Sequence, residues 1–150
     1  MKSLQMLVLF SVLLTLAACA NDGPKLSYSP QNIMQAVNTK YPAERTNLIY
    51  IGAPEGFIAP REAIKEVKDG VDAGKVVAII TALHVNTSTV IITGTDDDLN
   101  AATLARALTT GKEKVSGSKV IYVGGKESLS NLSKLASDAG VNIEFMDLPS

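Results

Sequence analysis

Cysteine, histidine and tryptophan are nearly missing from this chain of 150 residues, which has one Cys, one His and no Trp. A single cysteine cannot form an internal disulfide. One Cys and one His are also too few for a structural zinc site, which takes its ligands from larger sets of these residues. We therefore expect neither a disulfide framework nor a bound metal or other cofactor.

An excess of positive charge is missing as well. The chain has 14 Lys and Arg against 15 Asp and Glu, and 46% of its residues are hydrophobic. Nucleic-acid-binding proteins normally have a basic excess, and disordered chains combine low hydrophobicity with high net charge. The composition argues against both classes, so we expect no nucleic-acid partner. The length suits one domain.

Residues 1–19 have the pattern of a secretory signal. Lys2 supplies a positive charge, and an apolar run follows from Met6 to Leu16. As a helix this run is too short to span a bilayer about 30 Å thick. Its length is typical of the apolar region of a signal peptide, and small residues and Cys19 follow it.

The end of this segment, Leu16-Ala17-Ala18-Cys19, resembles the lipobox of bacterial lipoproteins. In that class the cysteine thiol is lipidated, the peptide before it is removed, and the cysteine becomes the acylated N-terminus. The resemblance implies a signal peptide at 1–18, a lipidated N-terminus and tether at 19–30, and lipid attachment at Cys19. The alternative is an ordinary secretory signal in which the cysteine is coincidental.

The same resemblance implies a location. Lipoproteins kept at the inner membrane have Asp directly after the cysteine, whereas this chain has Ala20. In a host with two membranes, the resemblance therefore implies anchoring at the outer membrane, facing the periplasm. Two or more acyl chains hold a protein stably where one holds it marginally. The tether, 20–30, extends to at most about 40 Å, so we expect the domain to stay near its membrane.

From residue 31 onward, strand-like and helix-like segments alternate. Three apolar runs each end at a glycine and a polar turn, in LIYIGAPE, VIITGTDD and VIYVGGKE, and a fourth covers 142–146. Such runs are typical of parallel strands buried on both faces. Helical spacing appears at 31–40, 99–108 and 129–139. We predict one α/β domain over 31–150, with a small, open, mainly parallel, Rossmann-like sheet of about four strands flanked by helices.

The segment 60–85 permits two interpretations. The β-branched residues within 76–83 permit a strand. Against this, small residues recur every four positions, which favours a helix through most of the segment with these residues along one face. Glycine inside a helix costs about 1 kcal/mol relative to alanine, so for 75–85 both helix and strand stay open. The small residues are Gly70, Gly74, Ala78 and Ala82.

Candidate ligand-binding residues follow the strand-like runs, because ligands of open α/β sheets bind beyond the carboxyl ends of the strands. Clustered carboxylates such as Asp96, Asp97 and Asp98 can hold Mg²⁺ or Ca²⁺, but the same residues can cap the helix that follows, and we favour capping. Gly124-Gly125-Lys126 can approach a phosphate through backbone N–H groups or can form a tight turn. The candidates are Asp96, Asp97, Asp98 and Lys126.

Catalytic residues do not form a recognisable set in the sequence. His84 is the only histidine, GxSxG is missing, and the single thiol is assigned to a lipid. A general base needs a nucleophile beside it. The sequence favours a non-enzymatic lipoprotein that binds or assembles another envelope component, either a protein or the cell wall. The alternative is a small-ligand-binding protein or hydrolase that uses the crevice at the carboxyl ends of the strands.

Overall fold

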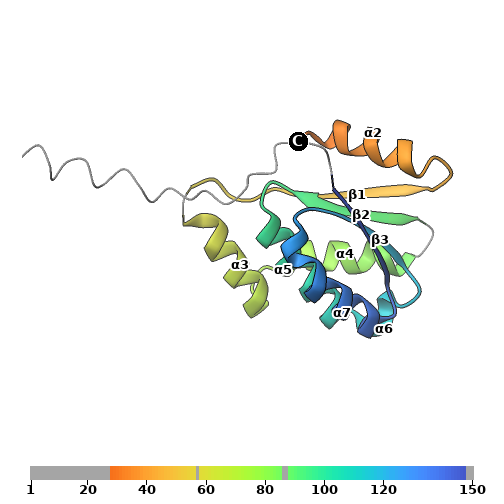
Figure 1. The fold of residues 1–150 in the computed structure, drawn as a ribbon. Helices are drawn as coiled ribbons and strands as arrows, with labels where there is room; N and C mark the ends of the chain where they lie inside the picture. The colour runs from red at the N-terminus through yellow and green to blue at the C-terminus, as the bar shows by residue number, and fades with distance from the viewer. Residues whose placement is uncertain (1–27, 57, 86–87, 148–150) are drawn as a thin grey trace, which may run out of the picture.

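The computed structural model describes residues 28–56, 58–85 and 88–147. The predicted signal peptide, Cys19 and most of the predicted tether lie outside these residues. The described chain forms a four-stranded sheet in which all neighbours are parallel, with helices on both faces (Figure 1). The predicted α/β class is confirmed.

The sheet order follows the chain order, β1-β2-β3-β4. The strands are β1 (Thr46–Ile51), β2 (Thr89–Gly94), β3 (Lys119–Val123) and β4 (Asn142–Met146). The helices are α2 (Pro30–Lys40), α3 (Ala59–Asp69), α4 (Gly74–Val85), α5 (Asp97–Thr110), α6 (Lys112–Val115), the short 3-10 helix η1 (Lys126–Ser128) and α7 (Leu129–Ala139).

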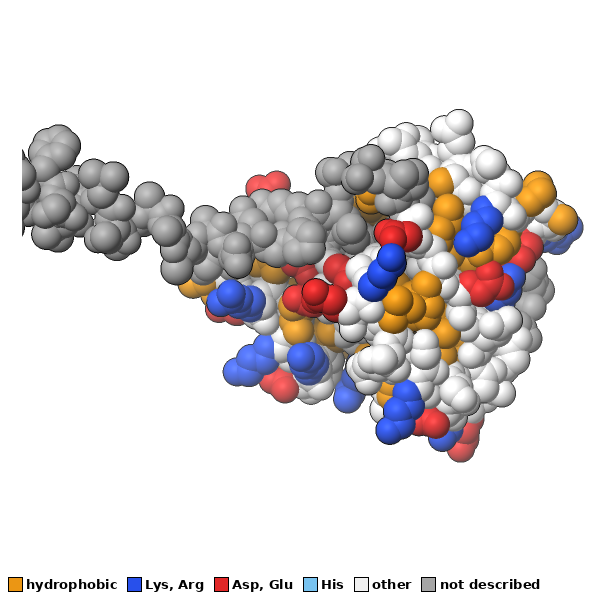
Figure 2. Space-filling model, in the orientation of Figure 1, with side chains coloured by type: hydrophobic (Ala, Val, Ile, Leu, Met, Phe, Trp, Pro, Cys, Tyr) orange, Lys and Arg blue, Asp and Glu red, His pale blue; other side chains and the backbone are white. Residues whose placement is uncertain are grey.

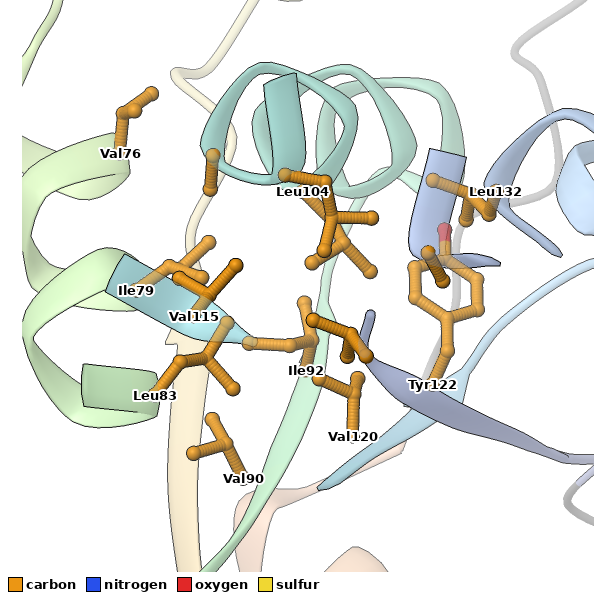
Figure 3. Packing of buried hydrophobic residues seen from close by; sticks show 14 of the residues in the cluster. Val76, Ile79, Leu83, Val90, Ile92, Leu104, Val115, Val120, Tyr122 and Leu132 are labelled. Atoms are coloured by element: carbon orange, nitrogen blue, oxygen red, sulfur yellow. The ribbon is translucent and has the colours of Figure 1, made fainter. Parts of the chain in front are cut away.

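Two hydrophobic clusters cover the opposite faces of the sheet, because successive side chains of a strand point to opposite sides. The larger cluster joins Ile92 and Tyr122 of the central strands to α3, α4, α5, α6 and α7 (Figure 3). The smaller cluster joins Ile91 and Ile121 to α2. All crossover helices thus lie on one face, and α2 lies on the other (Figure 1).

Local sequence signals explain several element boundaries. The Ser29 hydroxyl accepts a hydrogen bond from the Asn32 N–H at 3.2 Å, and Pro30 occupies the first turn of α2, as expected for a helix start. Gly140 ends α7 at a φ of 68°, a conformation that glycine adopts without strain. All six positions of β2 are buried, which explains its continuous apolar run.

The segment 60–85 is helical, but it forms two helices. Gly70 ends α3 at a φ of 80°, and α4 begins at Gly74. The strand interpretation of 75–85 is therefore wrong. The expectation of one face of small residues along a single helix is also wrong, because a left-handed glycine redirects the chain between its members. Ala78 and Ala82 continue within α4, where Ala78 is exposed.

Gly94 provides a test of the close packing between β1, β2 and α5. A Cβ atom at Gly94 would lie 2.0 Å from the Ile51 carbonyl oxygen and 2.3 Å from Asn100 Oδ1. We expect Gly94→Ala to lower the free energy of unfolding by about 1–3 kcal/mol, because overpacking displaces backbone. Urea denaturation followed by circular dichroism measures this.

Gly52→Ala is the matched control, because no heavy atom lies within 4 Å of a Cβ built at Gly52. We expect its free energy of unfolding to stay within about 0.5 kcal/mol of the unsubstituted protein. Equal losses for the two substitutions would contradict the packing described at Gly94.

Candidate functional site

The three neighbouring aspartates have three different environments. Asp96 caps α5, because its Oδ1 accepts a hydrogen bond from the Leu99 N–H at 2.9 Å. Asp97 points toward β3, where its Oδ1 accepts from the Tyr122 hydroxyl at 2.8 Å. Asp98 is exposed on the outer side of α5. The capping interpretation thus describes Asp96, and the three carboxylates do not converge.

The Asp97 carboxylate lies against the glycine turn after β3. A Cβ atom on Gly124 would lie 2.0 Å from Asp97 Oδ1, and one on Gly125 would lie 2.8 Å from Oδ2. The Ser128 hydroxyl donates to Oδ2 at 3.3 Å. The turn therefore needs glycine to admit the chain's own carboxylate, which stands where an external anion would have to approach. Burial raises the pKa of Tyr122, and its hydrogen bond to Asp97 acts in the same direction.

Lys126 points away from the aspartates. Its side chain is 80% exposed, and its ammonium lies 3.5 Å from a carboxylate oxygen of Asp147. An ion pair at this exposure contributes little to stability. The structure thus places the four predicted residues in separate environments rather than around one ligand.

A groove of about 640 Å³ lies between α3, α5 and α7. α5 contributes small side chains to its lining, namely Ala101, Ala102 and Ala105. Asp98 also lines the groove, together with charged and polar residues of the flanking segments: Lys68, Arg106, Glu127, Ser128 and Asn131. Charged side chains of both signs gather over α3 in Figure 2. The sequence did not reveal this groove, because its lining comes from three separate helices.

The carboxyl edge of the sheet lacks the feature that creates a ligand crevice in many α/β proteins. That crevice forms where the strand order reverses and neighbouring crossovers leave on opposite faces. In the described sheet the order runs β1-β2-β3-β4 without a reversal. The groove therefore lies between helices on one face and not at a switch point between strands.

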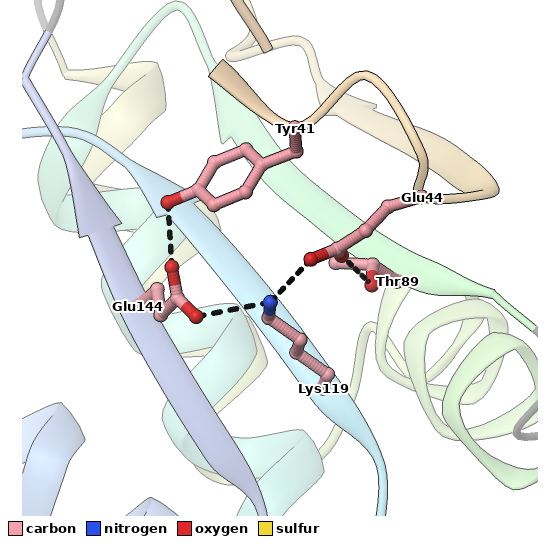
Figure 4. A network of polar contacts seen from close by, with 5 residues as sticks. All are labelled: Tyr41, Glu44, Thr89, Lys119 and Glu144. Atoms are coloured by element: carbon pink, nitrogen blue, oxygen red, sulfur yellow. Dashed lines mark hydrogen bonds and ion pairs between the residues drawn. The ribbon is translucent and has the colours of Figure 1, made fainter. Parts of the chain in front are cut away.

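A polar network that the sequence did not suggest lies at the amino-terminal ends of β2 and β3 (Figure 4). The Lys119 ammonium lies 2.6 Å from Glu44 Oε1 and 2.9 Å from Glu144 Oε1. The Tyr41 hydroxyl donates to Glu144 Oε2 at 2.5 Å, and the Thr89 hydroxyl donates to Glu44. The network connects the segment after α2 to three strands. A lysine at the start of the apolar run 119–123 is the one sequence signal that points to it.

The network shifts the pKa values of its charged members. The hydrogen bond from Lys119 lowers the pKa of Glu44, and the bonds from Tyr41 and then Lys119 lower that of Glu144. The two carboxylates raise the pKa of Lys119 in return. Burial and then Glu144 raise the pKa of Tyr41. These shifts favour the charged pairs, so we assign the network a structural role in attaching α2.

Comparisons of the chain with protein-family models, with curated proteins and with solved structures found no match. Within 28–56, 58–85 and 88–147, no helix combines the length and the hydropathy needed to cross a membrane. The same described residues contain no group of three or more His, Cys, Asp or Glu side chains placed to hold a metal ion.

The network predicts a pH-dependent stability. Glu44 and Glu144 have lowered pKa values in the folded protein, so their stabilisation is complete above the ordinary carboxyl pKa and is lost as pH falls through the folded values. We expect Lys119→Met to cost about 1 kcal/mol at pH 7, because these partly exposed carboxylates lose their cation. This cost should shrink toward pH 3, where both carboxylates are protonated. Urea denaturation at several pH values measures it.

Lys134→Met is the control for this measurement, because it removes the same charge from an exposed position on α7. We expect its effect on stability to be small at every pH. A cost of Lys119→Met that stays constant from pH 7 to pH 3 would show that the carboxylates are not involved.

Proposed function

We propose that the protein is an envelope lipoprotein anchored through Cys19, and that its α/β domain is a non-enzymatic binding or assembly factor. Its partner is an envelope protein or the cell wall, in the periplasm or at the outer membrane. The lipobox resemblance at Leu16-Ala17-Ala18-Cys19 supports the anchor. The separate environments of Asp96, Asp97 and Lys126 support a role other than catalysis.

The opposition of α2 and the groove is the observation that best supports a binding role. The tether enters the domain at Ser29, the cap of α2, on the face of the smaller cluster. The groove lies among α3, α5 and α7, on the face of the larger cluster. A domain held by its α2 side can therefore present the groove to a partner.

A small-ligand-binding protein or hydrolase is the second candidate function. The observation in its favour is the lining of the groove, where Asp98, Glu127 and Ser128 occur together. The polar set first expected for it, Asp96, Asp97, Asp98 and Lys126, supplies only Asp98 to that lining.

Cys19→Ser tests the anchor directly. We expect this substitution to abolish labelling with a fatty-acid probe, because the acylated thiol is missing, and to release the protein from the membrane fraction. Gel fluorescence of the labelled protein and fractionation of the envelope measure the two effects.

Ala20→Ser is the neighbouring control and should keep the label and the membrane fraction. Ala20→Asp should also keep the label but move the protein to the inner membrane, as the sorting rule of the class implies. Fatty-acid labelling that persists in Cys19→Ser would refute the anchor.

Crosslinking in cells tests the binding role of the groove. A photoreactive amino acid at Ala102, in the groove lining, should repeatedly capture the same envelope protein or glycan. The same amino acid at Lys134, on the exposed surface of α7, should capture much less of it. Mass spectrometry identifies the captured partner, and equal capture at the two positions would count against the groove.

A further inference from the structure

β1 is an edge strand with backbone groups that point away from the sheet. The Arg45 carbonyl accepts from the Thr89 N–H at 2.8 Å, and the Ile51 carbonyl accepts from the Thr95 N–H at 3.2 Å. Alternate residues of a parallel strand bond to the same neighbour. The remaining residues of β1 therefore direct their N–H and C=O groups outward, and in the described sheet no strand pairs with them. They are Thr46, Leu48 and Tyr50.

β1 also lacks the features that normally protect an edge strand. Natural edges are protected by lysine, proline, inward charges or bulges. The sequence of β1, TNLIYI, contains no charge and no proline. The opposite edge strand, β4, includes Glu144, and Asp147 follows it. Of the two edges, β1 is the one suited to pairing with another strand.

α4 lies over β1 and β2 and has an exposed apolar side. It buries Val76, Ile79 and Leu83 against the sheet (Figure 3). Its other valines are exposed, with Val77 at 55% and Val85 at 59%. A helix that is apolar on all sides is normally covered on all sides. The outer side of α4 is therefore a surface suited to a partner.

The direction of this outer side follows from two contacts at the ends of α4. The Lys75 ammonium reaches the carbonyl oxygen of Gly52, just after β1, at 3.4 Å. His84 Nδ1 lies 3.0 Å from the carbonyl oxygen of Lys114 in α6. At about 100° per residue, His84 is opposite Lys75. The residues that share the β1 side of α4 are Ala78, Ala82 and Val85.

We propose that the β1 edge and this side of α4 bind a second copy of the chain across a twofold axis. β1 pairs antiparallel with β1 of the other copy, and α4 packs against α4. The occupant of this surface must offer a free strand edge beside an uncharged helix side, and the chain itself offers both. A twofold axis places each element against its own counterpart.

The composition of α4 is compatible with this symmetric contact. α4 contains no acidic residue, and Lys75 lies 4.0 Å from Asp72 of its own copy. Small side chains at Ala78 and Ala82 allow two helices to approach closely. An axis perpendicular to the sheet leaves both α2 helices on the same face, so two tethers can reach one membrane. The proposal does not depend on lipid attachment at Cys19.

Cysteine crosslinking of the full chain in the bacterial envelope tests the contact. We expect Ala78→Cys to give a disulfide-linked dimer on a non-reducing gel after mild oxidation. Ser133→Cys, at an exposed position on α7, should give at least tenfold less dimer. The unsubstituted chain gives the background from Cys19. Equal dimer from Ala78→Cys and Ser133→Cys would overturn the proposal.

A second substitution in the Ala78→Cys chain tests the strand pairing. Tyr50→Pro removes an outward N–H, and an edge strand tolerates proline where that group faces solvent. We expect it to reduce the dimer at least tenfold, whereas Tyr50→Thr, which keeps the N–H, should not. A dimer that is unaffected by Tyr50→Pro would overturn the pairing of β1 with β1.

Ala78→Glu keeps the proposal testable if Tyr50→Pro fails to fold, because an exposed helix position tolerates glutamate. Two such carboxylates would meet near the axis, so we expect the dimer dissociation constant to rise at least tenfold in sedimentation of the detergent-solubilised protein. Ser133→Glu should leave it unchanged. A monomeric unsubstituted protein, or equal effects of the two substitutions, would overturn the proposal.

Discussion

The placement of all crossovers on one face of the sheet determines the rest of the structure. Each strand pairs in parallel with the next strand along the chain, so each connection must return across the sheet. The helices α3, α4, α5, α6 and α7 therefore cover one face, and α2 is left to cover the other. This asymmetry separates the tethered side from the groove, and it leaves β1 and β4 as open edges.

Much of this fold could be predicted from the sequence. β2 is buried at all six positions, so its apolar run is continuous and marks a central parallel strand. The break at Gly70 could not be predicted, because a glycine spaced four residues from Gly74 fits one helix as well as two. Only the φ of 80° at Gly70 distinguishes them.

The candidate site was harder to predict than the fold. Asp97 and Asp98 are neighbours in a helix, where successive side chains diverge by about 100°. One faces the buried Tyr122 and the other lines the groove. The network around Lys119 depends on strand register, which brings Glu44 and Glu144 to one ammonium from segments far apart in the chain.

The lipid anchor is the central claim of the functional account, since it gives meaning to the separation of the tethered face from the groove. Intact mass spectrometry of the protein from its native envelope tests this claim most directly. The account predicts a chain that begins at Cys19 and has the added mass of a diacylglycerol, with or without a third acyl chain. A chain with an unmodified thiol at Cys19, or one that begins at another residue, would contradict it.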